Sequence, residues 1–412
     1  MKMILGSKRH HYVTKASIFL ITVALIAGMV GCNGTSPAAE IWDWYDLDAI
    51  RDNLGASCLL MCDLHSAADG YGELASETAN QGRGWQPIGS QDKPFTGTFD
   101  GQGFEVGDLS ISRLDTDHVG LFGFIGEKGV IKNVGVVNAY VVGELCVGGL
   151  VGINWGTVSN SYSDGSVSGS DQVGGLVGGN GGSVSNSYAT GMVNGDRHVG
   201  GLVGASNGPV SNSHFSGSVS GESRIGGLVG GMSGSTVSNS YSAGSVSGSS
   251  DQVGGLVGYN YGTVSKSCST GAVAGDSYTG GLVGFNRDTV SDSYSSGNVT
   301  GGWLAGGLVG QNRGTISKSY SAGPVTGDVD VGGLVGRNYE GSVSNSFWDT
   351  ETSGQHTSDG GTGKTTAELQ DKVTFSGAMW NMIEVADPDS RNPSYIWNIV
   401  DNMTYAFLSW QS

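Results

Sequence analysis

The sequence predicts an all-β fold: a parallel β-solenoid (β-helix) of about nine coils, with three short strands per coil and small mixed α/β caps. Three observations support this prediction. The pentapeptide Gly-Gly-Leu-Val-Gly occurs eight times, and its leucines are 26 residues apart except for one step of 28. Short segments rich in Val, Thr and Tyr, bounded by Gly, Asn or Ser, follow each copy. No unit contains an apolar pattern long enough for a helix.

Composition excludes several classes of protein. Glycine supplies 74 of the 412 residues, but it does not recur at every third position as collagen requires. Its periodic spacing also argues against simple disorder. The formal net charge is −17, from 37 acidic and 20 basic residues. Nucleic-acid binding needs clustered Lys and Arg, so we expect no nucleic-acid partner.

Residues 1–31 are predicted to be a signal peptide, because a basic start precedes an apolar run over 16–30 that is too short to span a membrane. The run ends in Met29-Val30-Gly31-Cys32, which resembles a bacterial lipobox with Met29 where Leu is usual. The resemblance implies that Cys32 is lipidated and anchors the chain in the membrane.

The residue after the lipidated cysteine bears on the destination of a lipoprotein. Asn33 stands where Asp favours retention in the inner membrane, so an outer-membrane or cell-surface location is expected. The alternative is an ordinary secretory signal cleaved near 36–39, which would make the protein secreted. Residues 32–39 are predicted to be a flexible tether.

Residues 40–117 are predicted to form the N-terminal cap and the first strands. The sequence indicates a short helix over 45–54, a buried strand over 57–64 and further strands over 85–112. These elements would cover strand edges that an open solenoid end leaves unpaired.

Residues 118–347 are predicted to be the solenoid itself, in which stacking aligns equivalent residues about 4.8 Å apart. The leucine of each pentapeptide is expected to form the core; these are Leu150, Leu176, Leu202, Leu228, Leu256, Leu282, Leu308 and Leu334. Six corner asparagines are expected to stack as an amide ladder: Asn154, Asn180, Asn260, Asn286, Asn312 and Asn338.

A further column is mostly aromatic, and its facing is left open by the sequence. Its members are Tyr162, Tyr188, His214, Tyr241, Cys268, Tyr294, Tyr320 and Phe347. Two residues before each lies Asn, Lys or Asp, so strict alternation would put charge and ring on one face. Either the Val and Tyr columns face outward around a serine-lined interior, or a bulge switches the facing.

Residues 348–412 are predicted to form the C-terminal cap over the other open end. A helix is expected from Thr366 to Lys372, and a hairpin from 395–400 and 403–410. Gly363-Lys364-Thr365 resembles the end of a phosphate loop, but the required earlier glycine is Ser358 and no strand precedes it. Thr365 and Glu368 instead fit a helix capping box.

The pentapeptides, with Val-Ser-Asn-Ser-Tyr between them, resemble the GLUG motif repeats of bacterial surface proteins. The resemblance covers about Gly120 to Phe347, and the flanking Trp85-Gln86-Pro87 and Phe347-Trp348-Asp349 segments also look like those of GLUG-repeat proteins. It implies a surface-exposed β-solenoid. Some family members are attached to proteases that cleave immunoglobulin A through a zinc-binding His-Glu-x-x-His helix. No such motif occurs here, so protease activity is not carried over.

Candidate chemical sites are few, and we expect no catalytic residue and no cofactor. Cys58 and Cys62, with His65 nearby, are better explained as buried free thiols than as a metal site. Asp196-Arg197-His198 and Glu222-Ser223-Arg224 lie in adjacent coils, where a surface ion-pair patch is favoured over catalysis.

Seven acids precede the Gly-Gly pairs and are expected to form one column: Glu144, Asp171, Asp196, Glu222, Asp251, Asp276 and Asp328. Oxygen ligands suit Ca²⁺, so this column is a candidate metal site. Solvated corners that discourage lateral aggregation are the simpler interpretation.

The sequence therefore favours a non-enzymatic, lipid-anchored surface solenoid with an adhesive or structural role. Its expected partners are the membrane, through the N-terminal lipid, and a glycan, matrix protein or cell-surface ligand. The alternatives are a carbohydrate-active β-helix enzyme, such as a polysaccharide lyase or hydrolase, and a passive stalk. An enzyme should interrupt its repeat where substrate binds and gather titratable groups there, which the uniform 26-residue step argues against.

Overall fold

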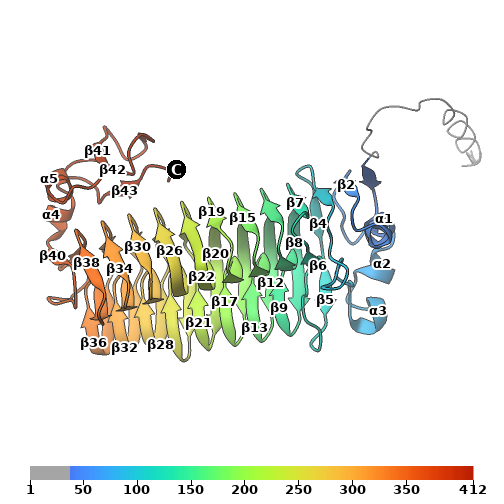
Figure 1. Cartoon of the computed structure of the whole chain (residues 1–412), viewed down its shortest axis with the longest axis horizontal. Coiled ribbons are helices and arrows are strands. Elements are labelled where there is room, and N and C mark those ends of the chain that lie inside the picture. Colours follow the sequence, from blue (N-terminus) through green and yellow to red (C-terminus); the bar gives the residue numbers. More distant parts are fainter. Residues whose placement is uncertain (1–37, 412) are drawn as a thin grey trace, which may run out of the picture. The chain divides into compact units, whose positions relative to one another are not determined.

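The strands of the chain wind into a parallel β-solenoid, as predicted (Figure 1). The structure is a computed structural model, and it describes residues 38–411. The predicted signal peptide, the lipidation site Cys32 and residues 32–37 of the predicted tether lie outside the described residues. Among residues 38–411, no helix combines the length and the apolarity needed to cross a membrane.

Each coil contributes to two parallel sheets, which contain 19 and 21 strands. Successive coils pair in register, so that Val151 lies opposite Val177 and Val177 opposite Val203. The chain bends at Gly175-Leu176, between β13 (Asp171–Gly174) and β14 (Val177–Asn180). The predicted strand over Gly174–Gly178 is therefore divided between the two sheets, and most coils carry four strand segments.

The first sheet holds the Val-Gly-x-Asn and x-Val-Ser segments of successive coils. Its strands are β1 (Ala39–Ile41), β2 (Ser57–Leu60), β3 (Thr98–Asp100), β6 (Phe122–Ile125), β7 (Val130–Lys132), β10 (Val151–Asn154), β11 (Thr157–Ser159), β14, β15 (Ser183–Ser185), β18 (Val203–Ser206), β19 (Val210–Ser211), β22 (Val229–Ser238), β26 (Val257–Ser265), β29 (Val283–Asn286), β30 (Thr289–Ser291), β33 (Val309–Asn312), β34 (Thr315–Ser317), β37 (Val335–Asn338) and β38 (Ser342–Ser344).

The second sheet holds the segments that start at the aromatic column and those that end in Val-Gly or its equivalent. Its strands are β4 (Glu105–Gly107), β5 (Ser110–Ser112), β8 (Gly135–Val142), β9 (Leu145–Gly148), β12 (Tyr162–Ser168), β13, β16 (Tyr188–Asn194), β17 (Arg197–Gly200), β20 (His214–Gly221), β21 (Ser223–Gly226), β23 (Tyr241–Ser242), β24 (Ser245–Gly248), β25 (Asp251–Gly254), β27 (Cys268–Ser269), β28 (Val273–Gly280), β31 (Tyr294–Ser295), β32 (Val299–Gly306), β35 (Tyr320–Ser321), β36 (Val325–Gly332), β39 (Phe347–Asp349) and β40 (Thr362–Lys364).

The predicted leucine column lies in the core, where all eight side chains are fully buried. The leucines stand at the bend that joins the two sheets, packed among the valines of both. The last glycine of the pentapeptide, inside β14, allows the two sheets to approach closely beside this bend. A Cβ on Gly178 would lie 2.5 Å from the backbone of Cys146 and Val147 in the preceding coil, so no larger residue fits there without moving the chain.

Two polar ladders run through the interior. In the predicted asparagine ladder, Nδ2 of Asn260 donates to Oδ1 of Asn286 at 2.7 Å, and Asn286 donates to Asn312 at 2.7 Å. A second ladder is made of serines: the Oγ of Ser187 accepts from the backbone N–H of Ser161 at 3.2 Å and donates to the carbonyl of Ser185 at 2.8 Å. Both ladders satisfy polar groups that would otherwise be buried without partners.

A residue with left-handed backbone conformation precedes the aromatic column and turns its rings outward. The valine column does not face outward. Val158 and Ser161 are buried, whereas Tyr162 is half-buried. Between them, Asn160 has φ of 49°. Equivalent residues in the other coils have φ of 46–49°: Asn186, Asn212, Asn239, Lys266, Asp292, Lys318 and Asn345. This corner resets the alternation, so that valine and serine point inward and the aromatic ring points outward.

The N-terminal cap agrees with the sequence in outline. Helix α1 (Trp44–Ala49) and the 3-10 helix Ile50–Asp52 occupy the predicted helical segment and bury Trp44 and Leu47. The predicted strand over 57–64 is shorter, ending at Leu60. Two further short helices follow, α2 (Tyr71–Leu74) and α3 (Ala79–Gly82).

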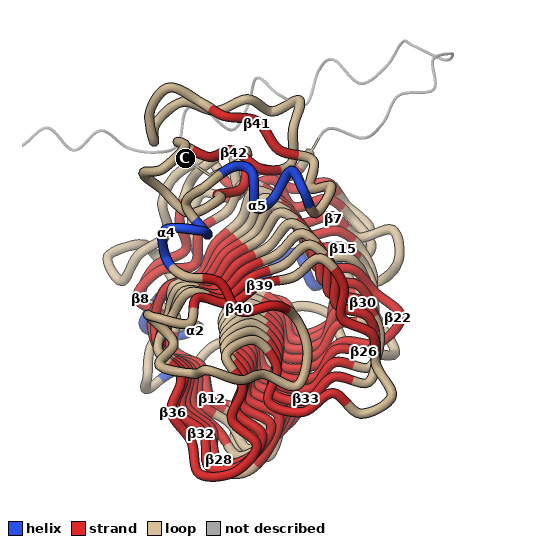
Figure 2. Tube along the Cα trace, turned by 90° about the vertical axis from the view of Figure 1, so that its left-hand side faces the viewer, coloured by secondary structure: helices blue, strands red, loops and turns tan. Residues whose placement is uncertain are grey.

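The C-terminal segment differs in position from the expectation. The loop before β40 closes the end of the stack, where Ser358 Oγ accepts from the N–H groups of Leu334 and Val335. Residues 366–411 instead lie along one side of the solenoid (Figures 1 and 2). They comprise α4 (Thr366–Leu369), α5 (Lys372–Gly377), β41 (Met382–Glu384), β42 (Trp397–Ile399) and β43 (Phe407–Leu408).

Local predictions for this segment are confirmed. The capping box is present: Thr365 Oγ1 accepts from the N–H of Glu368 at 3.2 Å, and the Glu368 carboxylate accepts from the N–H of Thr365 at 2.8 Å. Strands β42 and β43 form the predicted antiparallel hairpin, with Trp397 opposite Leu408. Of the predicted cap over 348–412, the residues before β40 lie over the end of the stack, whereas the aromatic side chains of residues 366–411 pack on the aromatic column at its side.

We predict that Leu228→Ala lowers the free energy of unfolding by about 2–5 kcal/mol, because it leaves a cavity in the leucine column. Leu228 is fully buried, whereas Leu114, which is 72% exposed, provides the matched control Leu114→Ala. Urea unfolding followed by circular dichroism should show a lower midpoint for the first variant alone. Equal midpoints would contradict the assignment of the leucines to the core.

We predict that Asn286→Ala destabilises the solenoid by about 1–3 kcal/mol, because Asn260 then loses its buried acceptor and Asn312 its donor. Asn286→Ser should cost less, since Ser206 holds the same ladder position and accepts from Asn180 at 3.0 Å. The measurement is the difference in unfolding midpoint between the two variants. A ladder that contributes nothing would leave both close to the unmodified protein.

Candidate functional site: the exposed aromatic ladder

The outward-facing rings of four consecutive coils stack on one another. The ring centroids of Tyr162 and Tyr188 are 4.8 Å apart, those of Tyr188 and His214 4.9 Å, and those of His214 and Tyr241 4.7 Å. The interplanar angles are 1°, 8° and 3°. The separation equals the rise between coils, so in-register stacking creates the ladder. We call these four residues the exposed ladder.

The exposed ladder is fixed at both ends by contacts outside it. The hydroxyl of Tyr162 donates to the carboxylate of Glu105. At the other end the ring of Trp410 lies 6.2 Å from that of Tyr241, and its indole N–H donates to the carbonyl of Lys266 at 2.9 Å. The ladder is therefore a preformed and rigid surface.

The second half of the aromatic column is covered by residues 366–411. Trp397 packs 5.9 Å from Tyr320, and Trp380 lies 6.0 Å from Phe347. The hydroxyl of Tyr320 donates to the carbonyl of Ala406 at 2.6 Å, and burial raises the pKa of Tyr320 well above its ordinary value. One continuous column is thus divided into a covered half and an open half.

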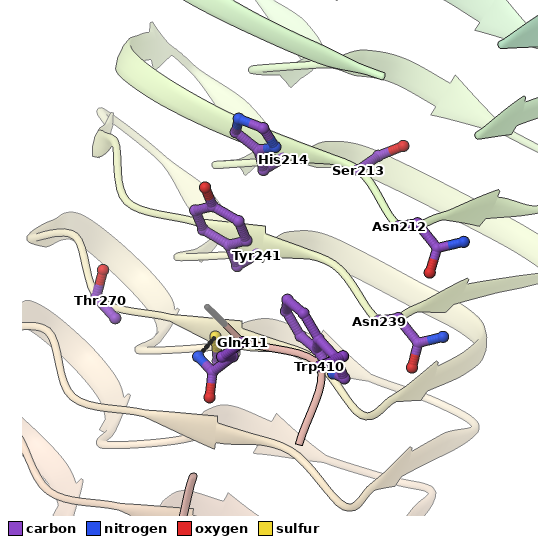
Figure 3. Close-up of a pocket in the computed structure, with 9 residues that line it drawn as sticks. Asn212, Ser213, His214, Asn239, Tyr241, Thr270, Trp410 and Gln411 are labelled. Atoms are coloured by element: carbon purple, nitrogen blue, oxygen red, sulfur yellow. Dashed lines mark hydrogen bonds between the residues drawn. The ribbon is translucent and has the colours of Figure 1, made fainter. Parts of the chain in front are cut away.

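A pocket of about 540 Å³ lies where the two halves meet (Figure 3). Its aromatic walls are His214, Tyr241 and Trp410, and the side chains of Asn212 and Asn239 stand beside them. Within residues 38–411, neither of these amide groups has a hydrogen-bond partner. Ring edges beside unpaired amides offer apolar contact together with donors and acceptors, which suits an uncharged polar ligand.

The mixed charge cluster has different members from those expected. His198 Nδ1 donates to Asp171 at 2.7 Å, and its Nε2 accepts from Arg224 at 2.7 Å. Asp196 and Glu222 take no part in this network. Burial, and secondarily Arg224, lowers the pKa of His198 against the opposing effect of Asp171. Both ring nitrogens of His198 are thus engaged, and of the residues expected in the ion-pair patch only His198 and Arg224 take part.

The predicted single column of acids is corrected to two. Glu144, Asp196, Glu222, Asp276 and Asp328 share one column, interrupted by Ser170, Ser250 and Gly302. Asp171 and Asp251 lie in the next column, opposite Arg197 and Ser277. The cause is an offset of one residue, because these two acids precede Gly-Gly by three positions and the others by four.

Metal-binding groups do not form at the predicted positions. Among the described residues, no three His, Cys, Asp or Glu side chains are placed to hold one metal ion. Cys58, Cys62, Cys146 and Cys268 are free thiols; Cys58 is buried as expected, whereas Cys62 is only half-buried. Burial raises the pKa of Cys58 to about 11 and that of Cys146 to about 12, so these thiols are protonated and unreactive near neutral pH.

Comparison with known families supports the resemblance in the repeats. The family model described as the GLUG motif matches residues 143–168, 169–194 and 275–300. The first two segments are consecutive coils, in which Tyr162 lies opposite Tyr188, and the third lies nearer the C-terminal end of the solenoid.

Two protein relatives match parts of this sequence. "Halomucin" of Haloquadratum walsbyi is 36% identical over 156 residues, which is 36% of this chain but 2% of halomucin. "Putative Gly-rich membrane protein" of Evansella cellulosilytica is 40% identical over 82 residues, 19% of this chain and 10% of that protein. This chain therefore spans only a small part of the length of either relative.

Among solved structures, a chain titled "putative immunoglobulin A1 protease from Bacteroides ovatus" is 18% identical. The likeness covers 90% of this chain and 92% of that chain, with a TM-score of 0.41. A likeness at this level carries no argument about activity.

We predict that His214→Tyr reduces the acid sensitivity of the fold. Burial lowers the pKa of His214 below its ordinary value of 6.5, so the unfolded chain binds more protons between the two pKa values. The stability that neutral His214 contributes is therefore present above about pH 6.5 and is lost as the pH falls toward the folded-state pKa.

The measurement is the melting temperature at pH 7.5 and pH 5.5. The variant should lose less than the unmodified protein, since tyrosine does not titrate there and continues the stack of Tyr188 and Tyr241. His198 is unchanged in both proteins, so the difference isolates His214. An identical pH dependence would show that protonation of His214 has no part in it.

Proposed function

We propose that this chain is a non-enzymatic, surface-displayed β-solenoid that binds an extracellular macromolecule along the exposed ladder, in an adhesive role. The observation that supports this most directly is the division of one aromatic column. Its last four members are buried under residues 366–411, whereas Tyr162, Tyr188, His214 and Tyr241 are only half-buried, and of these Tyr241 alone contacts the covering segment, through Trp410.

The repeated geometry suits an extended ligand. Each coil presents one ring and one corner asparagine at the same spacing, so a chain molecule laid along the axis would meet the same contact several times. Linked weak contacts of this kind raise the overall affinity through effective concentration. The rigid stack also limits the entropy lost on binding.

A location on the cell envelope would place this surface where such ligands occur. The proposed anchor is a lipid on Cys32, with the outer membrane or cell surface as the destination. A relative whose name includes the words membrane protein is in keeping with this location. Secretion without an anchor is the alternative that the N-terminal sequence leaves open.

The non-enzymatic part of the proposal is supported by the one imidazole in the mixed charge cluster. His198 is bonded at both ring nitrogens, and Asp171 is engaged with it. Most glycoside hydrolases use a pair of carboxylates that flank the bound substrate. The pocket beside Tyr241 has no carboxylate among its lining residues.

We predict that arrays of glycans and matrix proteins, probed with the mature protein, will show binding that depends on the exposed ladder. Tyr188→Ala should weaken that binding about tenfold or more, as expected for loss of a central aromatic contact. The control is Trp303→Ala in β32, because Trp303 is 60% exposed but lies outside the ladder. Binding unaffected by Tyr188→Ala, or substrate cleavage in a parallel polysaccharide screen, would contradict the proposal.

A further inference from the structure

On the covered half of the aromatic column, the solenoid binds a segment of its own chain, residues 366–411. Its indole contacts follow a pattern: Trp410 donates to the carbonyl of Lys266 at 2.9 Å, and Trp380 donates to the carbonyl of Asn345 at 2.9 Å. Both acceptors are left-handed corner residues, two positions before a member of the column. The corner directs its carbonyl outward beside the ring, where an indole N–H can reach it.

The same acceptors are present and open along the exposed ladder. Asn160, Asn186, Asn212 and Asn239 have φ of 47–49°, as Lys266 and Asn345 have 48°. Their carbonyl oxygens accept no hydrogen bond from any residue in 38–411, whereas those of Lys266 and Asn345 do. The exposed ladder thus repeats the acceptor-and-ring unit that the covered half uses.

Ring geometry bears on the kind of ligand. The exposed rings lie nearly parallel and less than 5 Å apart, so they cover one another's faces and present mainly their edges. A sugar that stacks on an aromatic ring needs an open face. The two indoles that donate to corner carbonyls lie beside the column at small angles: Trp410 is inclined 25° to Tyr241 and Trp380 29° to Phe347, with centroids 6.2 and 6.0 Å apart, which is an offset packing.

We infer that the exposed ladder binds a tryptophan-bearing polypeptide segment of another protein, in the way that residues 380–410 bind the covered half. This inference rests on the proposed adhesive function and specifies a polypeptide as the class of ligand. The indole donates to a corner carbonyl while its ring packs against the ladder edge. The four corner residues of the exposed half are all asparagine, so the partner segment needs no particular charge.

The experiment selects random peptides displayed on phage against the mature protein. Selected peptides should be enriched in tryptophan, and replacing that tryptophan with alanine should reduce binding about tenfold or more. Binding should fall similarly with Tyr188→Ala or Tyr241→Ala and remain unchanged with Trp303→Ala. Melting temperatures confirm that each variant is folded.

A second measurement uses the unmodified protein alone, so it does not depend on the folding of any variant. A selected peptide carrying a photo-reactive benzophenone should cross-link within residues 160–241. Cross-links elsewhere, or peptides whose binding does not need an aromatic side chain, would overturn the inference.

The results separate the inference from the proposed function. Ladder-dependent binding of a glycan, with no ladder-dependent binding of peptides, would overturn the polypeptide ligand and leave the adhesive function standing. The absence of any ladder-dependent ligand, glycan or polypeptide, would overturn both.

Discussion

In-register stacking of coils is the constraint on which the rest of the structure depends. Because equivalent residues repeat at one coil spacing, each position in the repeat becomes a column whose members touch. The same rule produces the leucine core, the asparagine and serine ladders inside, and the ring stack outside. An amide suits an interior column because it both donates and accepts, although Ser206 and Met232 stand between the two runs of the asparagine ladder. Exterior columns need no such pairing, and there the sequence varies as well: His214 and Cys268 stand among tyrosines.

The sequence was informative wherever a column is defined by residue type alone. Leu176 and Asn286 could be assigned to the core and to a ladder because their neighbours 26 residues away are identical. The sequence was uninformative where the backbone conformation of one residue decides which way the next side chains point. The direction of the Tyr188 side chain depends on the left-handed φ of Asn186. The rule that successive side chains alternate between faces holds only within a regular strand, and Asn186 interrupts the strand. The acids are a different case, because the sequence itself contains the offset: Asp171 precedes Gly-Gly by three positions and Asp196 by four, which places them in neighbouring columns.

The place where residues 366–411 dock on the solenoid could not be predicted from short sequence segments. Capping box and hairpin are encoded by nearby residues, so both were predictable from short segments. Where the hairpin docks is decided by contacts such as Trp410 with Lys266, 144 residues apart in sequence. Trp397 and Phe375 are fully buried only because a complementary aromatic column exists on the solenoid side. Cover for the end of the stack comes instead from the short loop before β40.

This arrangement links stability and recognition. The segment that covers Tyr294 and Tyr320 buries large aromatic surfaces, each of which contributes to the fold in proportion to the apolar area removed from water. The exposed ladder lacks that cover and yet is held in place, since each ring is fixed by its neighbours and by the backbone of its own coil. A binding surface whose side chains are already ordered loses little conformational entropy when a ligand arrives. The stacking that builds the solenoid therefore also prepares its open face for binding, without any contribution from a flexible loop.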